Sequence, residues 1–161
     1  AIVGLPSSGL HTNGFSLVRK VFGEARETYE ARSPELGRTL GEAFLEPHRC
    51  YYNELKDLRP VIKGMAHITQ GGLEGNVPRI IPKGLMSSFD SRSWTVPPLF
   101  ELIQSRGDIP RAEMYRVFNM GIGMAVVTAP ENATQLTAAL PGAALIGEVV
   151  AQTGEVRAVI R

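Results

Sequence analysis

The sequence contains a single cysteine, Cys50, among its 161 residues. An internal disulfide is therefore excluded, and we expect a protein of the reducing cytoplasm. The sequence also lacks an apolar run of the roughly 20 residues that a membrane-spanning helix needs. Its most apolar segment, AALPGAALIGEVVA, is interrupted by Pro141, two glycines and Glu148. We therefore expect neither a disulfide-stabilised nor a membrane-bound protein.

An excess of charge of either sign is missing as well. Seventeen basic and sixteen acidic residues leave a formal net charge of +1. This balance gives no indication of a nucleic-acid partner or of an anionic membrane surface. The hydrophobic fraction of 43% and the charged fraction of 20% are those of an ordinary globular chain with about one domain.

Several familiar site motifs are absent. There is no phosphate-binding loop of the Walker type, no dinucleotide-binding fingerprint and no G-x-S-x-G elbow. His11, His48, His67 and Cys50 stand at unrelated spacings, so the sequence predicts no zinc site, and its carboxylates do not cluster as a two-metal site would require. We therefore predict no metal-binding residues in this chain.

The hydrophobic patterning predicts alternating strands and helices in irregular order. We expect strands over 1–5, 60–69 and 121–129 and a pair of strands within 144–160 joined by a turn at Thr153-Gly154. Helices are expected over 15–22 with Gly23 at the end, over 34–45 with Ser33 as N-cap, and over 96–107, 110–118 and 130–140, whereas 27–34 is expected to be a connection. The sequence thus predicts an α+β fold, a mixed β-sheet with flanking helices.

The first candidate site is the loop SSGLHTNG, Ser7 to Gly14, which precedes a predicted helix. The first turn of a helix has unpaired N–H groups and a partial positive charge, so a glycine-rich loop before it can hold an anion. Serine, threonine and asparagine side chains add donors, and His11 can donate to an oxyanion. A tight turn with an N-cap explains the same residues, and residue types alone favour that interpretation slightly.

The second candidate site is the segment GMAHITQGGLEGN, Gly64 to Asn76, in which a predicted strand ends near His67 and Thr69. Ligands in α/β sheets bind beyond the carboxyl ends of strands. A buried structural histidine followed by a glycine-rich exit loop is the alternative. Since both loops contain a histidine, we expect the two loops to converge. Asn119 precedes Gly121 and Gly123 before another strand, and the sequence does not decide whether its role is structural or functional.

Four segments in this order resemble one enzyme family: GLPSSGLHTNGFSLVRK, KGMAHITQGGLEGNVPRIIPKGL, WTVPPLFELI and EMYRVFNMGIGMAVV. They are similar to the C-terminal half of aminoimidazole ribonucleotide synthetase, also called phosphoribosylformylglycinamidine cyclo-ligase. The resemblance covers almost the whole chain. It implies that residues 1–161 are a single C-terminal domain, the C-terminal half of a two-domain ATP-dependent enzyme.

The resemblance also implies an activity. The family uses ATP and Mg²⁺ to close the imidazole ring of formylglycinamidine ribonucleotide, which gives aminoimidazole ribonucleotide in purine biosynthesis. The N-terminal half holds most of the ATP- and metal-binding residues and forms the homodimer. On this basis the expected partners are that N-terminal half and a phosphoribosyl substrate, and the chain alone is expected to be monomeric and inactive.

Position by position, the resemblance assigns substrate or phosphate binding to two sets of residues. They are Ser8, Gly9, His11, Asn13 and Gly14 in the first loop and Thr69, Gly71 and Gly72 in the second, with His11 and His67 as catalytic candidates. Gln70 replaces a glycine that is usual in the family. Two alternatives stay open: half of a related ATP-dependent enzyme, such as formylglycinamidine ribonucleotide synthetase or thiamine-phosphate kinase, and a non-catalytic ligand-binding domain.

Overall fold

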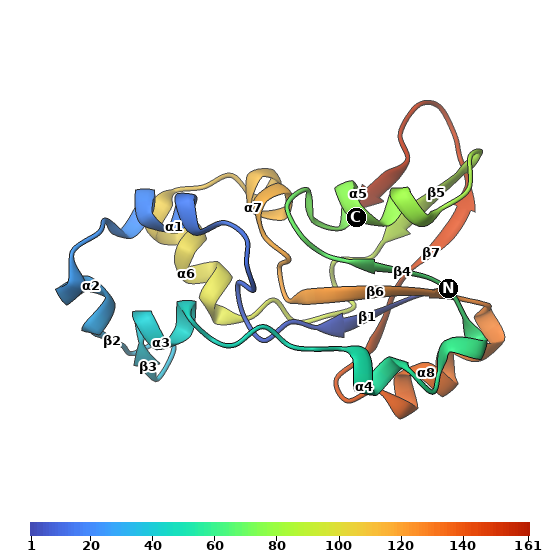
Figure 1. Cartoon of the computed structure of the whole chain (residues 1–161). Helices are drawn as coiled ribbons and strands as arrows, with labels where there is room; N and C mark the ends of the chain where they lie inside the picture. Colours follow the sequence, from blue (N-terminus) through green and yellow to red (C-terminus); the bar gives the residue numbers. More distant parts are fainter.

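A six-stranded mixed sheet forms the centre of the molecule in the computed structural model, which describes all of residues 1–161 (Figure 1). The strands pair in the order β4-β6-β1-β7-β5-β8, and every neighbouring pair is antiparallel except β5 and β8. The strands are β1 (Ile2–Pro6), β4 (Ile62–His67), β5 (Leu85–Phe89), β6 (Ile122–Thr128), β7 (Ala144–Ala151) and β8 (Ala158–Ile160). The predicted α+β fold with a mixed sheet is confirmed.

The remaining elements are short helices and one small hairpin. The helices are α1 (Phe15–Phe22), α2 (Arg26–Glu30), α3 (Leu40–Phe44), α4 (Tyr52–Leu55), α5 (Gly72–Asn76), α6 (Pro98–Gly107), α7 (Arg111–Val117) and α8 (Ala133–Ala139). Three 3-10 turns, η1 (Arg59–Val61), η2 (Val77–Ile80) and η3 (Pro130–Asn132), and the hairpin of β2 (Arg32–Ser33) with β3 (Arg38–Thr39) complete the fold. None of these helices combines the length and the apolar character that crossing a membrane requires.

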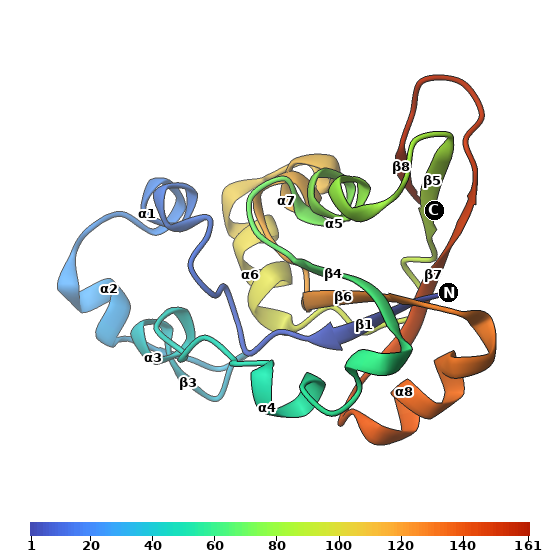
Figure 2. The same cartoon turned by 45° about the vertical axis from the view of Figure 1, so that its right-hand side comes forward.

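Both faces of the sheet are covered, which explains why β1 is apolar along its whole length. Ile2 packs with the residues that α5 and η2 lay over one face, whereas Val3 and Leu5 pack with α4 and α8 on the other. Figure 2 shows α4 and α8 on one side of the sheet and α5 on the opposite side. The alternation of neighbouring side chains between two faces is that of a regular strand.

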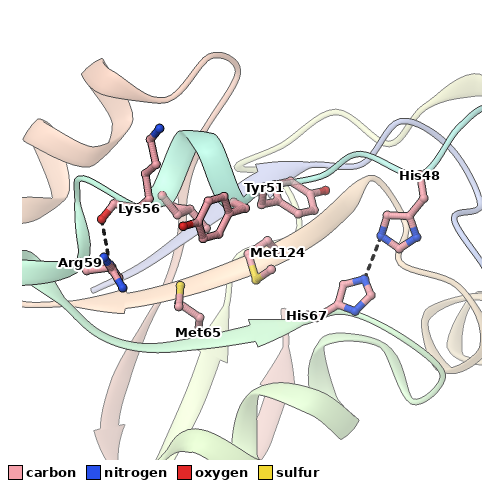
Figure 3. Close-up of a pocket in the computed structure, with 9 residues that line it drawn as sticks. His48, Tyr51, Lys56, Arg59, Met65, His67 and Met124 are labelled. Carbon is pink, nitrogen blue, oxygen red and sulfur yellow. Dashed lines mark hydrogen bonds between the residues drawn. The ribbon is translucent and has the colours of Figure 1, made fainter.

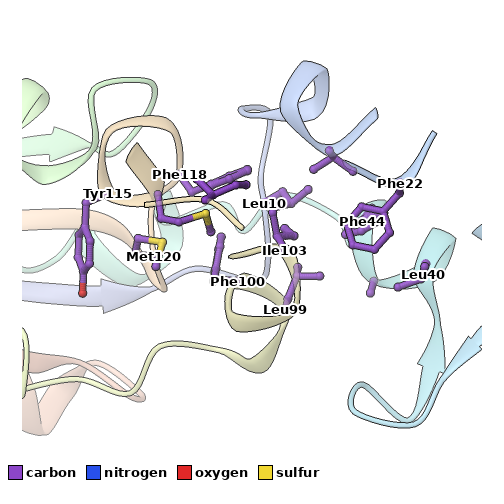
Figure 4. Packing of buried hydrophobic residues seen from close by; sticks show 14 residues of the cluster. Leu10, Phe22, Leu40, Phe44, Leu99, Phe100, Ile103, Tyr115, Phe118 and Met120 are labelled. Carbon is purple, nitrogen blue, oxygen red and sulfur yellow. The ribbon is translucent and has the colours of Figure 1, made fainter. Parts of the chain in front are cut away.

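A helical lobe extends from one end of the sheet and contains α1, α2, α3 and α6 (Figures 1 and 2). Its core holds 14 buried side chains, among them Phe44, Phe100 and Phe118 (Figure 4). Phe22 and Phe44 meet edge to face with ring centroids 5.2 Å apart. This core fixes α1, and α1 in turn fixes the end of the Ser7–Gly14 loop.

Most predicted elements are found where the sequence placed them. The helix at 15–22 ends at Gly23, whose φ of 78° lies in the left-handed region that glycine tolerates. The strands at 60–69 and 121–129 correspond to β4 and β6. The helices expected at 96–107 and 110–118 are α6 and α7, each preceded by a proline.

The predicted hairpin within 144–160 is wrong. The strands β7 and β8 exist, but they do not pair with each other, because β5 lies between them. β5 is antiparallel to β7 and parallel to β8. Only the turn residues near Gly154, with its φ of 74°, match the expectation.

The predicted helix over 34–45 is largely wrong as well. Gly37 adopts a φ of 65° inside the β2–β3 hairpin, and a helix does not accommodate that conformation. The helix begins only at Leu40, with Thr39 rather than Ser33 as N-cap and a capping box between Thr39 and Glu42. The connection expected over 27–34 also contains a helical turn, α2.

Candidate functional site

Strand direction brings the two candidate loops to the same edge of the sheet. β1 and β4 flank β6 and are both antiparallel to it, so they run parallel to each other. Their carboxyl ends therefore lie at the same edge of the sheet, on either side of the start of β6. The His11 and His67 ring centroids lie 6.3 Å apart. The expected convergence of the two loops is confirmed.

Asn119, at the entry to β6, holds the first loop in place. Its Oδ1 accepts hydrogen bonds from the Ser7 hydroxyl at 2.8 Å and from the Gly121 N–H at 2.9 Å. Its Nδ2 donates to the Gly9 carbonyl at 2.8 Å. The residue is 4% exposed. Asn119 is therefore a positioning residue, which settles the question that the sequence left open.

His11 is buried within this loop and adopts a left-handed φ of 59°. Its Nε2 accepts a hydrogen bond from the Ser8 N–H at 3.1 Å, so the proton of the neutral ring is on Nδ1. The Nδ1 atom is buried without a partner. A buried donor without a partner costs about 1–3 kcal/mol, a cost that a bound ligand can recover.

Gly123 of β6 forms the floor beneath this histidine. A Cβ at position 123 would collide with the Tyr51 hydroxyl and would lie 2.5 Å from the His11 Cε1. The absence of a side chain at Gly123 therefore makes the space that the two rings occupy. The residue that approaches Gly123 most closely, Tyr51, comes from another segment of the chain.

That segment, Pro47–Tyr51, carries His48 to the site. The Tyr51 hydroxyl and the Arg49 guanidinium both donate to the Pro6 carbonyl at the end of β1, at 2.9 and 3.0 Å. Arg49 also forms a two-point ion pair with Glu54, with separations of 3.1 and 2.6 Å. Burial raises the pKa of Tyr51 to about 12, so its hydroxyl stays protonated as a donor.

Three imidazoles meet at this place. The His11 and His48 rings stack with centroids 3.9 Å apart, and the His48 and His67 Nε2 atoms lie 3.1 Å apart (Figure 3). Burial lowers the pKa of His11 to about 4, and the positive charges of His48, His67 and Arg49 add to the effect. Desolvation and the neighbouring His48 also lower the pKa of His67. His11 is therefore neutral at pH 7 and acts as a hydrogen-bond donor rather than as a cation.

The second loop is shaped by its own contacts. The Thr69 hydroxyl donates to Oδ1 of Asn76 at 3.1 Å, and Nδ2 of Asn76 donates to the carbonyls of Thr69, Gln70 and Gly72. A Cβ at Gly72 would collide with the Tyr115 carbonyl oxygen, so this glycine permits α5 to pack on α7. Gln70 is exposed and is not among the residues of positive φ, so it is free of left-handed strain.

A pocket of about 370 Å³ adjoins the histidines (Figure 3). Its walls are mainly apolar, with Met65 and Met124 from β4 and β6, Tyr51, Tyr52 and Leu55 from the α4 region, and His48 and His67 at one end. Lys56 and Arg59 supply positive charge on the helical side. The site can therefore receive a ligand with an apolar part and an anionic part.

Sequence reasoning found part of this site and missed part. Ser8 and Gly9 lie in the first loop, but the Ser8 hydroxyl donates to the Pro47 carbonyl at 2.7 Å. Asn13 and Gly14 follow, half-buried, at the start of α1. Tyr51 lies outside every motif that the sequence singled out, and Asn76 ends the second candidate segment but was given no role there. The unrelated spacings of the histidines also concealed that all three lie together.

Replacement of Asn119 by alanine removes the side-chain hydrogen bonds that tie the first loop to the entry of β6. Because the Gly9 carbonyl and the Gly121 N–H then lose their partner inside the protein, we expect the free energy of unfolding to fall by about 2–4 kcal/mol. Chemical denaturation measures this change. The exposed Asn53 of α4 offers the matched control, and Asn53→Ala should stay within about 0.5 kcal/mol of the wild type. Equal effects of the two substitutions would contradict the role assigned to Asn119.

The lowered pKa of His11 predicts a pH-dependent stability. Between pH 6.5 and about 4 the unfolded chain binds a proton at His11 and the folded chain does not. The contribution of His11 to the free energy of unfolding is therefore complete above pH 6.5 and is lost as the pH falls towards 4. We expect a loss of about 3 kcal/mol at this residue between pH 7 and pH 4. Denaturation of the wild type and of His11→Gln across this range, in buffer with a metal chelator, measures it. An unchanged pH slope in His11→Gln would overturn the prediction.

Comparison with known proteins shows similarity to proteins named phosphoribosylformylglycinamidine cyclo-ligase. The chain is 47% identical over 163 residues to a phosphoribosylformylglycinamidine cyclo-ligase of Thermoanaerobacter sp. (strain X514). The matched region covers 97% of this chain and 48% of the relative. A cyclo-ligase of Desulfitobacterium hafniense is 47% identical over 161 residues, covering 94% of this chain and 46% of the relative. The chain thus spans about half the length of these curated relatives.

Two solved structures share the fold. Escherichia coli HypE, a hydrogenase maturation protein, superposes with a TM-score of 0.58 at 21% sequence identity. The superposed region covers 99% of this chain and 45% of the HypE chain. Thiamine monophosphate kinase from Aquifex aeolicus gives a TM-score of 0.57 at 15% identity, covering 99% and 48%. Residues 1–160 match the family described as AIR synthase related protein, C-terminal domain. This chain belongs to that family.

Proposed function

We propose that this chain is the substrate-side C-terminal half of a phosphoribosylformylglycinamidine cyclo-ligase. The complete enzyme closes the imidazole ring of formylglycinamidine ribonucleotide at the expense of ATP and forms aminoimidazole ribonucleotide in purine biosynthesis. The observation that carries the proposal is the meeting of the His11 and His67 loops at the carboxyl edge of the sheet. The 47% identity to proteins named as this enzyme supports it.

In this proposal the first loop binds the phosphate or another polar group of the substrate. Ser8, Gly9, His11, Asn13 and Gly14 lie in the loop that leads into α1, and the unpaired N–H groups of a helix start favour an anion. His11 contributes its Nδ1–H, the buried donor that has no partner within the chain. Because the ring is neutral, it orients the anion by a hydrogen bond and not by a full charge.

The second loop and the pocket complete the half-site. Thr69, Gly71 and Gly72 follow His67 at the same edge, and Lys56 and Arg59 line the neighbouring pocket. His67 is the second candidate for a catalytic role, because its Nε2 already exchanges a hydrogen bond with His48. Positioning of the reacting groups is the main contribution that such a half-site can make.

ATP and Mg²⁺ belong, in this proposal, to the N-terminal half of the enzyme. Mg²⁺ prefers oxygen ligands, and the one cluster of three potential ligands in this chain consists of histidines. The residues present do not fit a magnesium site, so we derive no step of the reaction through the ion. The N-terminal half also forms the dimer of the complete cytoplasmic enzyme, and the chain alone is monomeric and inactive.

Two other functions have weaker support. The likeness to thiamine monophosphate kinase shows the fold alone at 15% identity, so it does not favour a kinase half. A non-catalytic ligand-binding domain would need no acidic ATP-binding half beside it. The gene upstream of Ala1 discriminates between these possibilities, since an unrelated domain there would favour a binding module.

A domain exchange tests the proposed function. The chain replaces the C-terminal half of the Thermoanaerobacter relative, and ring closure of formylglycinamidine ribonucleotide is measured. We expect activity in the exchange protein. His11→Ala should lower kcat/KM about 10- to 100-fold, the cost of one hydrogen bond to a charged group. The exposed Ser105 of α6 gives the control, and Ser105→Ala should leave kcat/KM unchanged.

Two outcomes would contradict the proposal. One is a folded exchange protein without ring-closing activity when the unaltered relative is active in the same assay. The other is full activity of the His11→Ala protein. Turnover of a thiamine phosphate by the exchange protein would instead favour the kinase alternative.

A further inference from the structure

The proposed function uses His11 and His67 singly, and it gives no role to the cluster that these two residues form with His48. One nitrogen from each of His11, His48 and His67 lies within 4.8 Å of the other two. The rings come from three separate parts of the chain: the loop after β1, the irregular segment before α4, and the last residue of β4. No acidic side chain takes part in the cluster. It therefore consists entirely of imidazole donors.

The closest pair already has a spacing that suits a shared ion. The His48 and His67 Nε2 atoms are 3.1 Å apart. Tetrahedral Zn²⁺ with bonds of about 2.0–2.1 Å to nitrogen places its ligand atoms about 3.3 Å apart. An ion can replace the proton between the two rings, and the ring that donated this proton carries it on Nδ1 instead. The exchange releases no net proton.

His11 supplies the third nitrogen. The residue is 4% exposed, its Nδ1 has no partner, and its Nε2 accepts a hydrogen bond from the Ser8 N–H. Coordination therefore either exchanges the Ser8 hydrogen bond for a metal bond at Nε2 or moves the ring proton from Nδ1 to Nε2. His48, which stacks on His11 at an interplanar angle of 15°, must turn so that the lone pairs of both rings meet. His48 is exposed on an irregular segment, which permits this rotation.

The donor set selects the kind of ion. Imidazole suits Zn²⁺, Co²⁺, Ni²⁺ and Cu²⁺, whereas Mg²⁺ and Ca²⁺ prefer oxygen. His48 and His67 also line the 370 Å³ pocket, so the remaining coordination positions of an ion face that pocket. Three protein ligands with an open position are typical of zinc sites that bind water or a ligand rather than of purely structural ones.

We propose that His11, His48 and His67 bind one late first-row divalent ion of the Zn²⁺ class at the mouth of this pocket. The ion presents open positions to an oxygen or nitrogen atom of a molecule in the pocket. The site is separate from the Mg²⁺ that accompanies ATP, and it does not depend on the identity of the substrate. Measurement of metal binding alone therefore tests the proposal.

Calorimetric titration of the chain with Zn²⁺, with Mg²⁺ as comparison, tests the proposal. All proteins carry Cys50→Ser, because the exposed thiol lies two residues from His48 and is itself a potential zinc ligand. We expect one Zn²⁺ per chain and no Mg²⁺. His48→Ala and His67→Ala should each weaken Zn²⁺ binding by at least about a hundredfold, more than the roughly 10- to 100-fold cost of losing a supporting residue. His11→Ala should weaken it by at least about tenfold.

Co²⁺ provides a second readout, because a tetrahedral nitrogen site gives this ion a visible absorption that Zn²⁺ displaces. Lys56 lines the same pocket without being a proposed ligand. Lys56→Gln is therefore the matched control, and its affinity for Zn²⁺ should be unchanged. His48 and His67 are exposed, so their variants should fold even if His11→Ala does not. Absence of Zn²⁺ binding in the Cys50→Ser protein would overturn the proposal. Binding that survives both His48→Ala and His67→Ala would overturn it equally.

Discussion

The pairing of β6 with β1 on one side and β4 on the other is the constraint on which the rest of the structure depends. It makes β1 and β4 parallel, so the loops that follow them leave the sheet at the same edge. The residues before β6 lie between these two exits. Asn119, one of these residues, uses its side-chain amide to tie the first loop to the strand entry. Strand direction and one buried side chain thus bring together residues as far as 112 positions apart in the sequence.

Much of the sheet could be predicted because its strands are short apolar runs between glycines and prolines. β1 and β6 are examples, and both are buried on two faces. The hairpin prediction for residues 144–160 failed because adjacency in sequence does not reveal a third strand that inserts between two others, as β5 does here. The helix predicted from residue 34 failed because Gly37 was treated as a helical residue, whereas it forms a turn with positive φ.

The candidate site was only half accessible to sequence reasoning. The loops with His11 and His67 stood out by their glycines and small polar residues. His48 did not, because its position depends on Arg49 and Tyr51 reaching back to the Pro6 carbonyl. The glycines themselves proved ambiguous. Gly72 and Gly123 make room for protein atoms, the Tyr115 carbonyl in one case and the His11 and Tyr51 rings in the other. A glycine-rich segment therefore need not indicate contact with a ligand.

The histidine cluster joins the two parts of the account, the converging loops and the pocket beside them. His11 is buried and neutral, His48 and His67 are exposed, and all three lie at the carboxyl edge of the sheet. Chemical activity at this edge requires that both loops respond to one ligand. If each loop were only a turn, the two would behave independently.

Titration of the ¹⁵N-labelled chain with formylglycinamidine ribonucleotide, followed by the shifts of the backbone amide resonances, tests this central claim most directly. The account predicts that residues 7–14 and 67–72 respond together, with the same concentration dependence, because they line one half-site. A response confined to one of the two segments would contradict the account. A response centred on β5, β7 and β8, at the far side of the sheet, would contradict it as well.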